Sequence, residues 1–219
     1  MPTTAGLTPA RRPAPHAPGQ AAPGQPAEGT RARLLDSALS LFAINSFAGT
    51  SLQMIADTVG VTKAAVYHHF KTRHEILAAV IEPAGRELTS AIEAAEDKRS
   101  ATARAEAMLT GFVDVTIRHR ALIALICTDV GVTHTVGSRE DVARLIERML
   151  TLFTAHQSPP ESEVNATLAL TGIASTAASP MLRHLSDDAM HEHLLEAGRR
   201  ILSLRRRVHQ EPVHQGPAR

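Results

Sequence analysis

The chain has 219 residues, a formal net charge of +1 and a single cysteine, Cys127. This near-neutral charge excludes a global field that would mark a nucleic-acid or membrane partner, so any basic surface must be local. One cysteine excludes an internal disulfide and suits a reducing compartment. No run approaches the roughly 18 apolar residues of a transmembrane helix, and residues 1–20 lack the apolar centre of a secretory signal. We therefore expect a soluble, cytoplasmic protein with no membrane partner.

Composition and periodicity predict an all-α chain. Residues 1–29 are rich in Pro, Gly and Ala with little to bury, which is typical of a disordered tail, and residues 209–219 are expected to form another. Between the tails, apolar residues recur at helical spacing and no alternating strand pattern occurs. We expect two helical domains, over residues 30–82 and 83–208.

Short helices are predicted at the start of the first domain. Thr50 with Gln53, and Thr72 with Glu75, have the spacing of reciprocal capping pairs at helix N-termini. Gly60 suits the left-handed conformation that often ends a helix. The predicted helices span 30–45, 51–59, 63–70 and 73–97, with Thr50 as the cap of the second.

Proline and turn-rich segments divide the chain further on. Pro83 removes one backbone hydrogen bond, so we expect a kink at that point in the fourth helix. The segments GVTHTVGS (131–138) and HQSPPES (156–162) are rich in turn residues, and Ser138 and Ser186 are N-cap candidates. The helices expected in the second domain span 103–118, 120–129, 138–156, 161–184 and 187–207.

Residues 51–70 have the pattern of a helix-turn-helix. In such a unit the second of two short helices enters the major groove of DNA. Val66 and Phe70 are four residues apart and can point inward, whereas Lys63 and Tyr67 fall on the opposite face. Stiff rings with polar tips suit contacts with phosphates and base edges. The pattern predicts a recognition helix, with a purely structural helix pair as the alternative.

The sequence TSLQMIADTVGVTKAAVYHHFKTRHEIL, residues 50–77, resembles the DNA-binding domain of the TetR family of bacterial transcriptional regulators. The resemblance covers about residues 30–81. Ala64 departs from the glycine that the family often has, and Thr72-Arg73 departs from the usual Ser-Lys followed by an acidic residue. The second departure leaves open whether Lys71 or Arg73 contacts a phosphate.

The resemblance implies a homodimeric repressor that binds an inverted-repeat operator in double-stranded DNA, associates with the nucleoid and is released by a small, hydrophobic effector. Arg11 and Arg12 of the tail are either further phosphate contacts or simply solvated. The contacts expected on phosphates are Thr50, Ser51, Lys63, Tyr67 and Lys71. The contacts expected on base edges are Thr62, Ala64, Ala65, His68 and His69.

The second domain is expected to bind the effector. The segment ALIALIC (121–127) is apolar on all sides, which predicts a buried helix. A pocket around this helix would suit a hydrophobic ligand with a few polar anchors, although such apolar residues are more often plain core. The candidate pocket residues are Phe112, Ile126, Thr128, Asp129, His134 and Phe153, with His119 as a further anchor.

Small and apolar residues form stripes on the last two predicted helices. Small side chains permit close approach, so the stripes suit a self-complementary interface across a two-fold axis, with burial inside one subunit as the alternative. The expected interface residues are Leu170, Ile173, Ala174, Ala177, Leu194, Leu195, Gly198, Ile201 and Leu202.

We expect neither catalysis nor a cofactor. The chain has no GxSxG, no HExxH and no glycine-rich phosphate loop, so a helical enzyme is disfavoured. His184, His191 and His193 do not share one helix face and have no thiolate partner, so no metal site is predicted. A constitutive DNA-binding protein without an effector remains the alternative function.

Overall fold

The computed structural model describes residues 27–204 and confirms the expected all-α fold over this range. The predictions for residues 1–26 and 205–219 lie outside the described residues, whereas residues 27–29, expected in the N-terminal tail, begin the first helix. The elements are α1 (Ala27–Gly49), α2 (Leu52–Val59), α3 (Lys63–His69), α4 (Arg73–Glu96), α5 (Ala101–Arg118), α6 (Arg120–Thr128), α7 (Val130–Gly137), α8 (Glu140–Thr154), α9 (Glu161–Ala178), the 3-10 turn η1 (Pro180–Leu182) and α10 (Asp187–Ile201).

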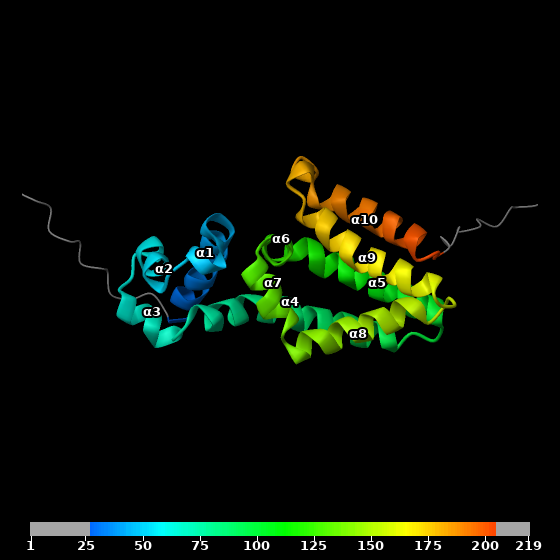
Figure 1. Ribbon diagram of the computed structural model, residues 1–219, viewed down its shortest axis with the longest axis horizontal. Coiled ribbons are helices and arrows are strands. Elements are labelled where there is room, and N and C mark those ends of the chain that lie inside the picture. The colour runs from blue at the N-terminus through cyan, green and yellow to red at the C-terminus, as the bar shows by residue number, and fades with distance from the viewer. Residues whose placement is uncertain (1–26, 205–219) are drawn as a thin grey trace, which may run out of the picture.

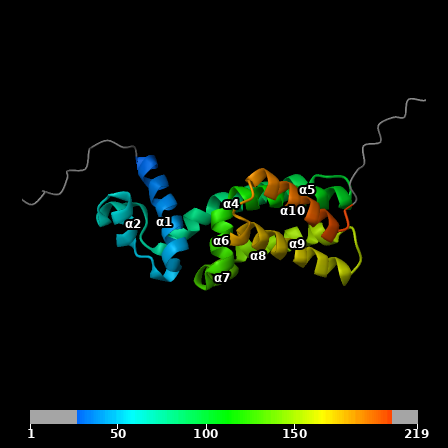
Figure 2. The same ribbon diagram turned by 90° about the horizontal axis from the view of Figure 1, so that it is seen from above.

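Helices α1, α2 and α3 form a small group at one end of the molecule, and α4 runs from this group into a larger C-terminal bundle (Figure 1). Seen from above, α6 and α7 lie on the side of the bundle nearest to α1 (Figure 2). The long helix α4 runs without a break from Arg73 to Glu96, with Pro83 inside it. It therefore connects the two parts of the chain directly.

Two clusters of buried side chains form the core. The first joins the N-terminal helices to the neighbouring part of the bundle, since Phe42 and Phe47 belong to the same cluster as Leu125 of α6 and Val132 of α7. The second cluster fills the bundle and is built from α4, α5, α8, α9 and α10. Burial of apolar surface therefore holds the N-terminal helices and the bundle together.

Side-chain caps explain where several helices begin. The hydroxyls of Thr62, Thr72, Ser100 and Ser186 each accept a hydrogen bond from the backbone N–H three residues further on. At α4 the Glu75 carboxylate also accepts from the Lys71 N–H at 2.8 Å. The caps predicted at Thr62, Thr72 and Ser186 are thus confirmed.

The prediction of a turn over residues 131–138 is wrong, because this segment forms α7. Asp129 caps α7 through a hydrogen bond from the Val132 N–H, and Val132 and Val136 are buried one helical turn apart. Ser138 is consequently the C-cap of α7 rather than an N-cap, and α8 starts at Glu140.

Two further expectations about the bundle are wrong. The helix predicted over residues 161–184 ends at Ala178, because Pro180 follows and Arg120 Nε donates to the Ala177 carbonyl oxygen at 2.6 Å. The segment 121–127 in α6 is not buried on all sides: of its residues only Leu122 and Leu125 are buried. One face of α6 packs inward and the opposite face lies at the surface.

Candidate DNA-binding site

The helix α3 is fixed by one polar cap and two apolar anchors. Thr62 Oγ1 accepts from the Ala65 N–H at 3.2 Å, while Gly60 takes the left-handed conformation (φ 76°) that the turn before α3 requires. Val66 and Phe70 are buried, as their spacing predicted. These contacts leave the remaining face of α3 free to meet a partner.

The exposed face of α3 carries positive and ring-bearing side chains and no carboxylate. Lys63 and His68 are exposed, and Tyr67 keeps 39% of its surface exposed. The Lys63 ammonium lies 5.7 Å from the centre of the Tyr67 ring. Lys71 Nζ donates to the Tyr67 carbonyl oxygen at 2.7 Å, so Lys71 adds its charge at the C-terminal end of the same face.

Beside α3 lies a hollow between the N-termini of α2 and α4. Ser51 Oγ caps α2 by accepting from the Met54 N–H at 3.1 Å, and Thr72 Oγ1 caps α4 in the same way. Helix N-termini attract anions. No Asp or Glu is among the residues that line the hollow, which are Ala48, Gly49, Thr50, Ser51, Leu52, Gln53, Lys63, Tyr67, Thr72, Arg73 and His74. We call this feature the anion hollow.

Thr50 is a correction within the expected phosphate set. The residue as a whole is 1% exposed, and its hydroxyl donates to the carbonyl oxygens of Leu41 and Ser46, so Thr50 offers almost no surface to DNA. Ser51, not Thr50, caps α2, and the Gln53 amide donates to Asp57 instead of closing a capping pair. The predicted capping pair at Thr50 and Gln53 is therefore wrong.

Arg73 binds backbone carbonyl oxygens at the end of α1, a role that was not predicted from the sequence. Its Nη1 donates to the carbonyl oxygens of Phe47, Ala48 and Thr50 at 2.9, 2.6 and 2.9 Å. The guanidinium also lies over the Phe47 ring, 5.3 Å from its centre. Because these carbonyls occupy Arg73, Lys71 is the better placed of the two for a phosphate.

The residues expected to contact base edges differ in their solvent exposure. Thr62, Ala64 and His68 are exposed, whereas Ala65 and His69 are half-buried. The His69 ring lies between those of His68 and Phe70, with centres 5.3 and 6.4 Å away. His69 therefore has less free surface than His68.

The expected ligand-pocket residues are not brought together. Phe112 and Phe153 are buried in the second core cluster, while Ile126 packs against the first. Thr128 donates its hydroxyl hydrogen to the Ala124 carbonyl oxygen, and His134 is exposed. Asp129 caps α7, and the further anchor named from the sequence, His119, has its Nε2 3.1 Å from a Glu87 carboxylate oxygen.

Five of the nine expected interface residues are buried inside a single subunit: Ile173, Ala177, Leu194, Gly198 and Leu202. Helices α9 and α10 pack so closely on α5 that a Cβ at Gly198 would lie 2.5 Å from Leu109 Cδ1. Leu170, Ala174, Leu195 and Ile201 are half-buried. The outward face of α9 instead carries Val164 and Leu168, which are 57% and 53% exposed.

Two of the three histidines near the C-terminus contact different partners. His191 Nε2 lies 2.6 Å from Asp114 Oδ1, a contact between α10 and α5, and His184 contacts the Met181 carbonyl oxygen. Over residues 27–204 no group of three or more His, Cys, Asp or Glu side chains is arranged to hold a metal ion. Within the same range no helix is both long and apolar enough to cross a membrane.

Comparisons with known proteins agree with this geometry. Residues 34–80 match the family described as bacterial regulatory proteins, tetR family. The chain is 42% identical over 52 residues to the HTH-type transcriptional regulator SrpR of Pseudomonas putida, a segment that makes up 24% of each protein. It is also 42% identical over 53 residues to the HTH-type transcriptional regulator AcrR of Shigella flexneri, covering 24% of this chain and 25% of AcrR. The matched segment thus spans about a quarter of these relatives.

Solved structures extend the likeness to the bundle. A TetR-like transcriptional regulator from Rhodococcus sp. RHA1 superposes with a TM-score of 0.61 at 23% identity, covering 82% of this chain and 99% of that one. A regulator of the TerR/AcrR family from Aquifex aeolicus has a TM-score of 0.59 at 22% identity, over 79% of this chain and 99% of its own. Residues 34–80 are therefore a domain of the TetR family of bacterial regulatory proteins, and the described residues share the fold of TetR-like regulators.

Proposed function

We propose that this protein is a homodimeric transcriptional repressor that binds an inverted-repeat operator and is released by a small, hydrophobic effector. The observation that carries the DNA-binding part is the anion hollow beside the exposed face of α3. Two capped helix N-termini and the cations Lys63 and Arg73 meet there, and no Asp or Glu lines the hollow. This arrangement suits a phosphate backbone that runs alongside a helix inserted into the major groove.

The proposed DNA contacts fall into two groups, according to where the residues lie. Ser51, Lys63, Tyr67 and Lys71 surround the anion hollow or extend its cationic edge, so we assign them to phosphates and leave out the buried Thr50. For base edges we assign Thr62, Ala64 and His68 from the open face of α3, with Ala65 and His69 at its margin. Phosphate contacts fix the register of the protein and base contacts select the sequence.

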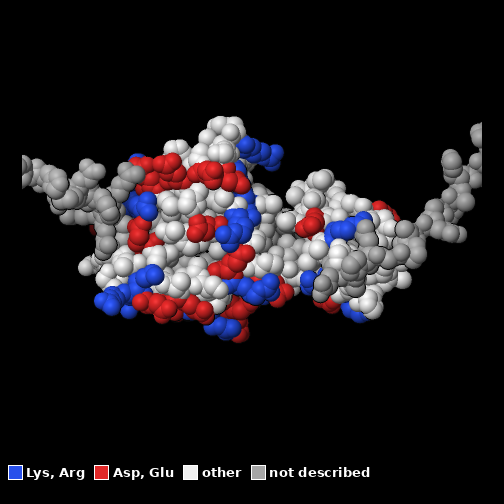
Figure 3. Space-filling view, turned by 180° about the vertical axis from the view of Figure 1, so that it is seen from behind, with Lys and Arg blue, Asp and Glu red and all other residues white. Residues whose placement is uncertain are grey.

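The charged surface of the bundle also favours the N-terminal end of the molecule as the DNA-binding end. On the face shown in Figure 3, rows of Asp and Glu cross the bundle among Lys and Arg side chains. Such a surface offers no continuous basic track for a duplex. A DNA partner would place the protein in the cytoplasm with the nucleoid.

For the homodimer we propose the outward faces of α9 and α10. Val164 and Leu168 form an exposed apolar pair one helical turn apart, and the small residues Thr171 and Ser175 continue the same face of α9. An exposed apolar helix face of this kind is costly in water unless a partner covers it. A second copy related by a two-fold axis would also supply the second recognition helix for an inverted repeat.

The proposal of a hydrophobic effector rests on two proteins of similar fold. Two proteins of similar fold are titled a ketosteroid transcriptional regulator of Mycobacterium tuberculosis and a putative fatty acid metabolism regulator of Clostridium perfringens, with TM-scores of 0.61 at 13% and 17% identity. A constitutive DNA-binding protein is the second candidate. Screening apolar compounds for a raised melting temperature together with release of DNA separates the two.

The test of DNA binding is selection of bound sites from random duplex DNA by the full chain. We expect an enriched inverted repeat. Lys63→Gln should then weaken binding to all duplexes and reduce the slope of affinity against salt by about one unit. The matched control is Lys98→Gln, because Lys98 is exposed at the turn between α4 and α5. No enrichment, or equal behaviour of the two variants, would refute the proposal.

A further inference from the structure

Asp129 links the bundle to the connection between α1 and α2, across 82 residues of sequence. Its Oδ2 accepts from the Phe47 N–H at 2.6 Å, while its Oδ1 accepts from the Val132 N–H at 3.0 Å and caps α7. Burial raises the pKa of Asp129, but hydrogen bonds from the backbone of Phe47, Val132 and Gly131 lower it, and the net pKa is below the ordinary value. The carboxylate is therefore ionised at neutral pH.

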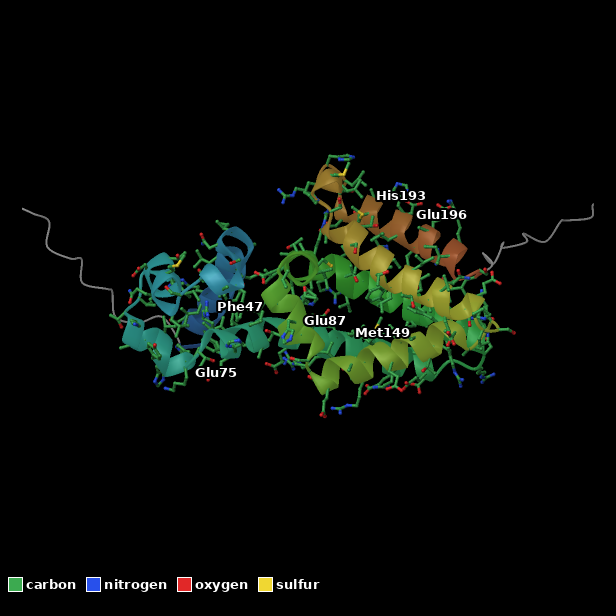
Figure 4. The ribbon with its side chains drawn as sticks, viewed as in Figure 1. Phe47, Glu75, Glu87, Met149, His193 and Glu196 are labelled. Carbon is green, nitrogen blue, oxygen red and sulfur yellow. The ribbon has the colours of Figure 1, made fainter. Side chains whose placement is uncertain are left out.

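Phe47, whose N–H donates to Asp129, is also held by several other contacts. Figure 4 shows Phe47 on the side of the N-terminal helices that faces the bundle. Its ring packs edge-on against Phe42 and His74, with centres 5.2 and 5.0 Å apart, and its carbonyl oxygen accepts from Arg73. A shift of the Phe47 backbone would therefore displace the first turn of α4.

The same residues border the anion hollow. Arg73 and His74 line it, and Arg73 also holds the carbonyl of Thr50, the residue before the cap of α2 at Ser51. Hydrogen bonds and ring contacts thus run without a gap from Asp129 to both helix N-termini that face the proposed phosphate. None of these contacts passes through the length of α4.

On its other side, Asp129 lies at the junction of α6 and α7, and α6 packs against α9. Arg120 at the start of α6 donates to the carbonyl oxygens of Ala177 and Leu182 at 2.6 and 3.3 Å. The position of α6 is therefore tied to α9 at one end and to the α1–α2 connection at the other.

We propose that Asp129 is a positioning residue through which the α6–α7 junction holds the anion hollow in the shape that accepts DNA. A movement of α6 within the bundle would act on DNA affinity through the bond from Phe47 to Asp129. This inference rests on the proposed DNA-binding function and adds a route of regulation to it.

Three variants separate the two bonds of Asp129. Asp129→Ser keeps a good N-cap for α7, but its hydroxyl is one bond shorter and does not reach the Phe47 N–H. Asp129→Asn keeps one acceptor oxygen and replaces the other with a donor NH2, so it can keep the cap of α7 or the bond from Phe47, but not both. Asp129→Ala removes both. The matched control is Asp141→Ser, because Asp141 is in the first turn of α8 and pairs with Arg139.

In the full-length protein we measure DNA affinity by fluorescence anisotropy on a duplex selected by the parent, and exchange of the Phe47 amide by NMR. We expect Asp129→Ser and Asp129→Ala to speed exchange at Phe47 and to weaken binding by a factor in the range of about 5 to 150, typical of coupled sites. Asp129→Asn should keep the parental affinity if its exchange at Phe47 is parental, and lose affinity if that exchange is faster. Asp141→Ser should match the parent in both readouts.

Parental affinity of Asp129→Ser with faster exchange at Phe47 would overturn the proposal, because the bond would then not govern the hollow. Unchanged exchange at Phe47 in Asp129→Ser would also overturn the proposal, because the bond to Asp129 would then not protect the Phe47 amide. Weakened binding by the Asn variant with parental exchange at Phe47 would overturn it as well, since the bond from Phe47 would then be intact. A parent that prefers no duplex refutes the DNA-binding function instead, and exchange at Phe47 still reports whether the link exists.

Discussion

Ser46 stores backbone strain just before Phe47, and replacing it with glycine should stabilise the protein. Ser46 has φ 64° and ψ 162°, a conformation that is essentially restricted to glycine and costs a residue with a side chain about 1–3 kcal/mol. Glycine loses about 0.5–1 kcal/mol through its more flexible unfolded chain. It also loses the exposed bond that Ser46 Oγ accepts from the Gly49 N–H at 3.1 Å, worth about 0.5 kcal/mol.

At the middle of these ranges the relief of strain exceeds the two losses, so Ser46→Gly should raise the free energy of unfolding by about 1 kcal/mol and the melting temperature by about 2–4 °C. Ser46→Ala keeps the strain and loses the bond, so it should destabilise. Urea unfolding of both variants followed by circular dichroism gives the two free energies. A less stable glycine variant, or an alanine variant more stable than the parent, would refute the argument from strain.

Other predictions test packing, assembly and ionisation. Gly198→Ala places a Cβ 2.5 Å from Leu109 Cδ1 and should destabilise by about 1–3 kcal/mol in thermal unfolding, whereas Gly85→Ala on α4, where the new Cβ meets nothing within 4 Å, should be neutral or stabilising. Leu168→Glu on the outward face of α9 should turn a dimer into a monomer in sedimentation velocity, and a monomeric parent would contradict the proposed surface. Because the folded-state pKa of Asp129 is lowered, its ionic contribution to stability is present above about pH 4 and is lost as the pH falls through the folded pKa. The difference in urea stability between the parent and Asp129→Asn should therefore shrink in acid, and a constant difference would contradict it.

Local signals in the sequence predicted local structure well. Thr62, Thr72 and Ser186 act as caps as predicted, since a cap depends on a hydroxyl and a backbone N–H only three residues away. Val66 and Phe70 are buried as their four-residue spacing indicated. The all-α fold and the exposed Lys63 and Tyr67 followed from the same kind of periodicity.

Signals that depend on the tertiary structure failed. Helix α7 was missed because its glycines and threonines resemble a turn, although the spacing of Val132 and Val136 could have indicated it. An apolar stripe does not say which partner covers it, so Ile173 and Leu194 were assigned to an interface although they pack inside the subunit. The bond between Phe47 and Asp129 joins residues 82 apart, and no local pattern marks it.

The sequence pattern alone could not decide whether Thr50 or Ser51 caps α2. Both are hydroxyl residues at the start of α2, and either could accept a capping bond. Only the path of the chain after Ser46 decides it, because this path buries Thr50 against the end of α1 and leaves Ser51 at the surface. The same path brings the three carbonyls to Arg73.

Titration of the full-length protein with its selected duplex, followed by backbone amide exchange residue by residue, tests the central claim most directly. The account predicts protection on binding at residues 51–54 and 62–75, which include the caps of α2 and α4 and the exposed face of α3. Protection confined to the bundle, with no change at Lys63, Tyr67 or Lys71, would contradict it.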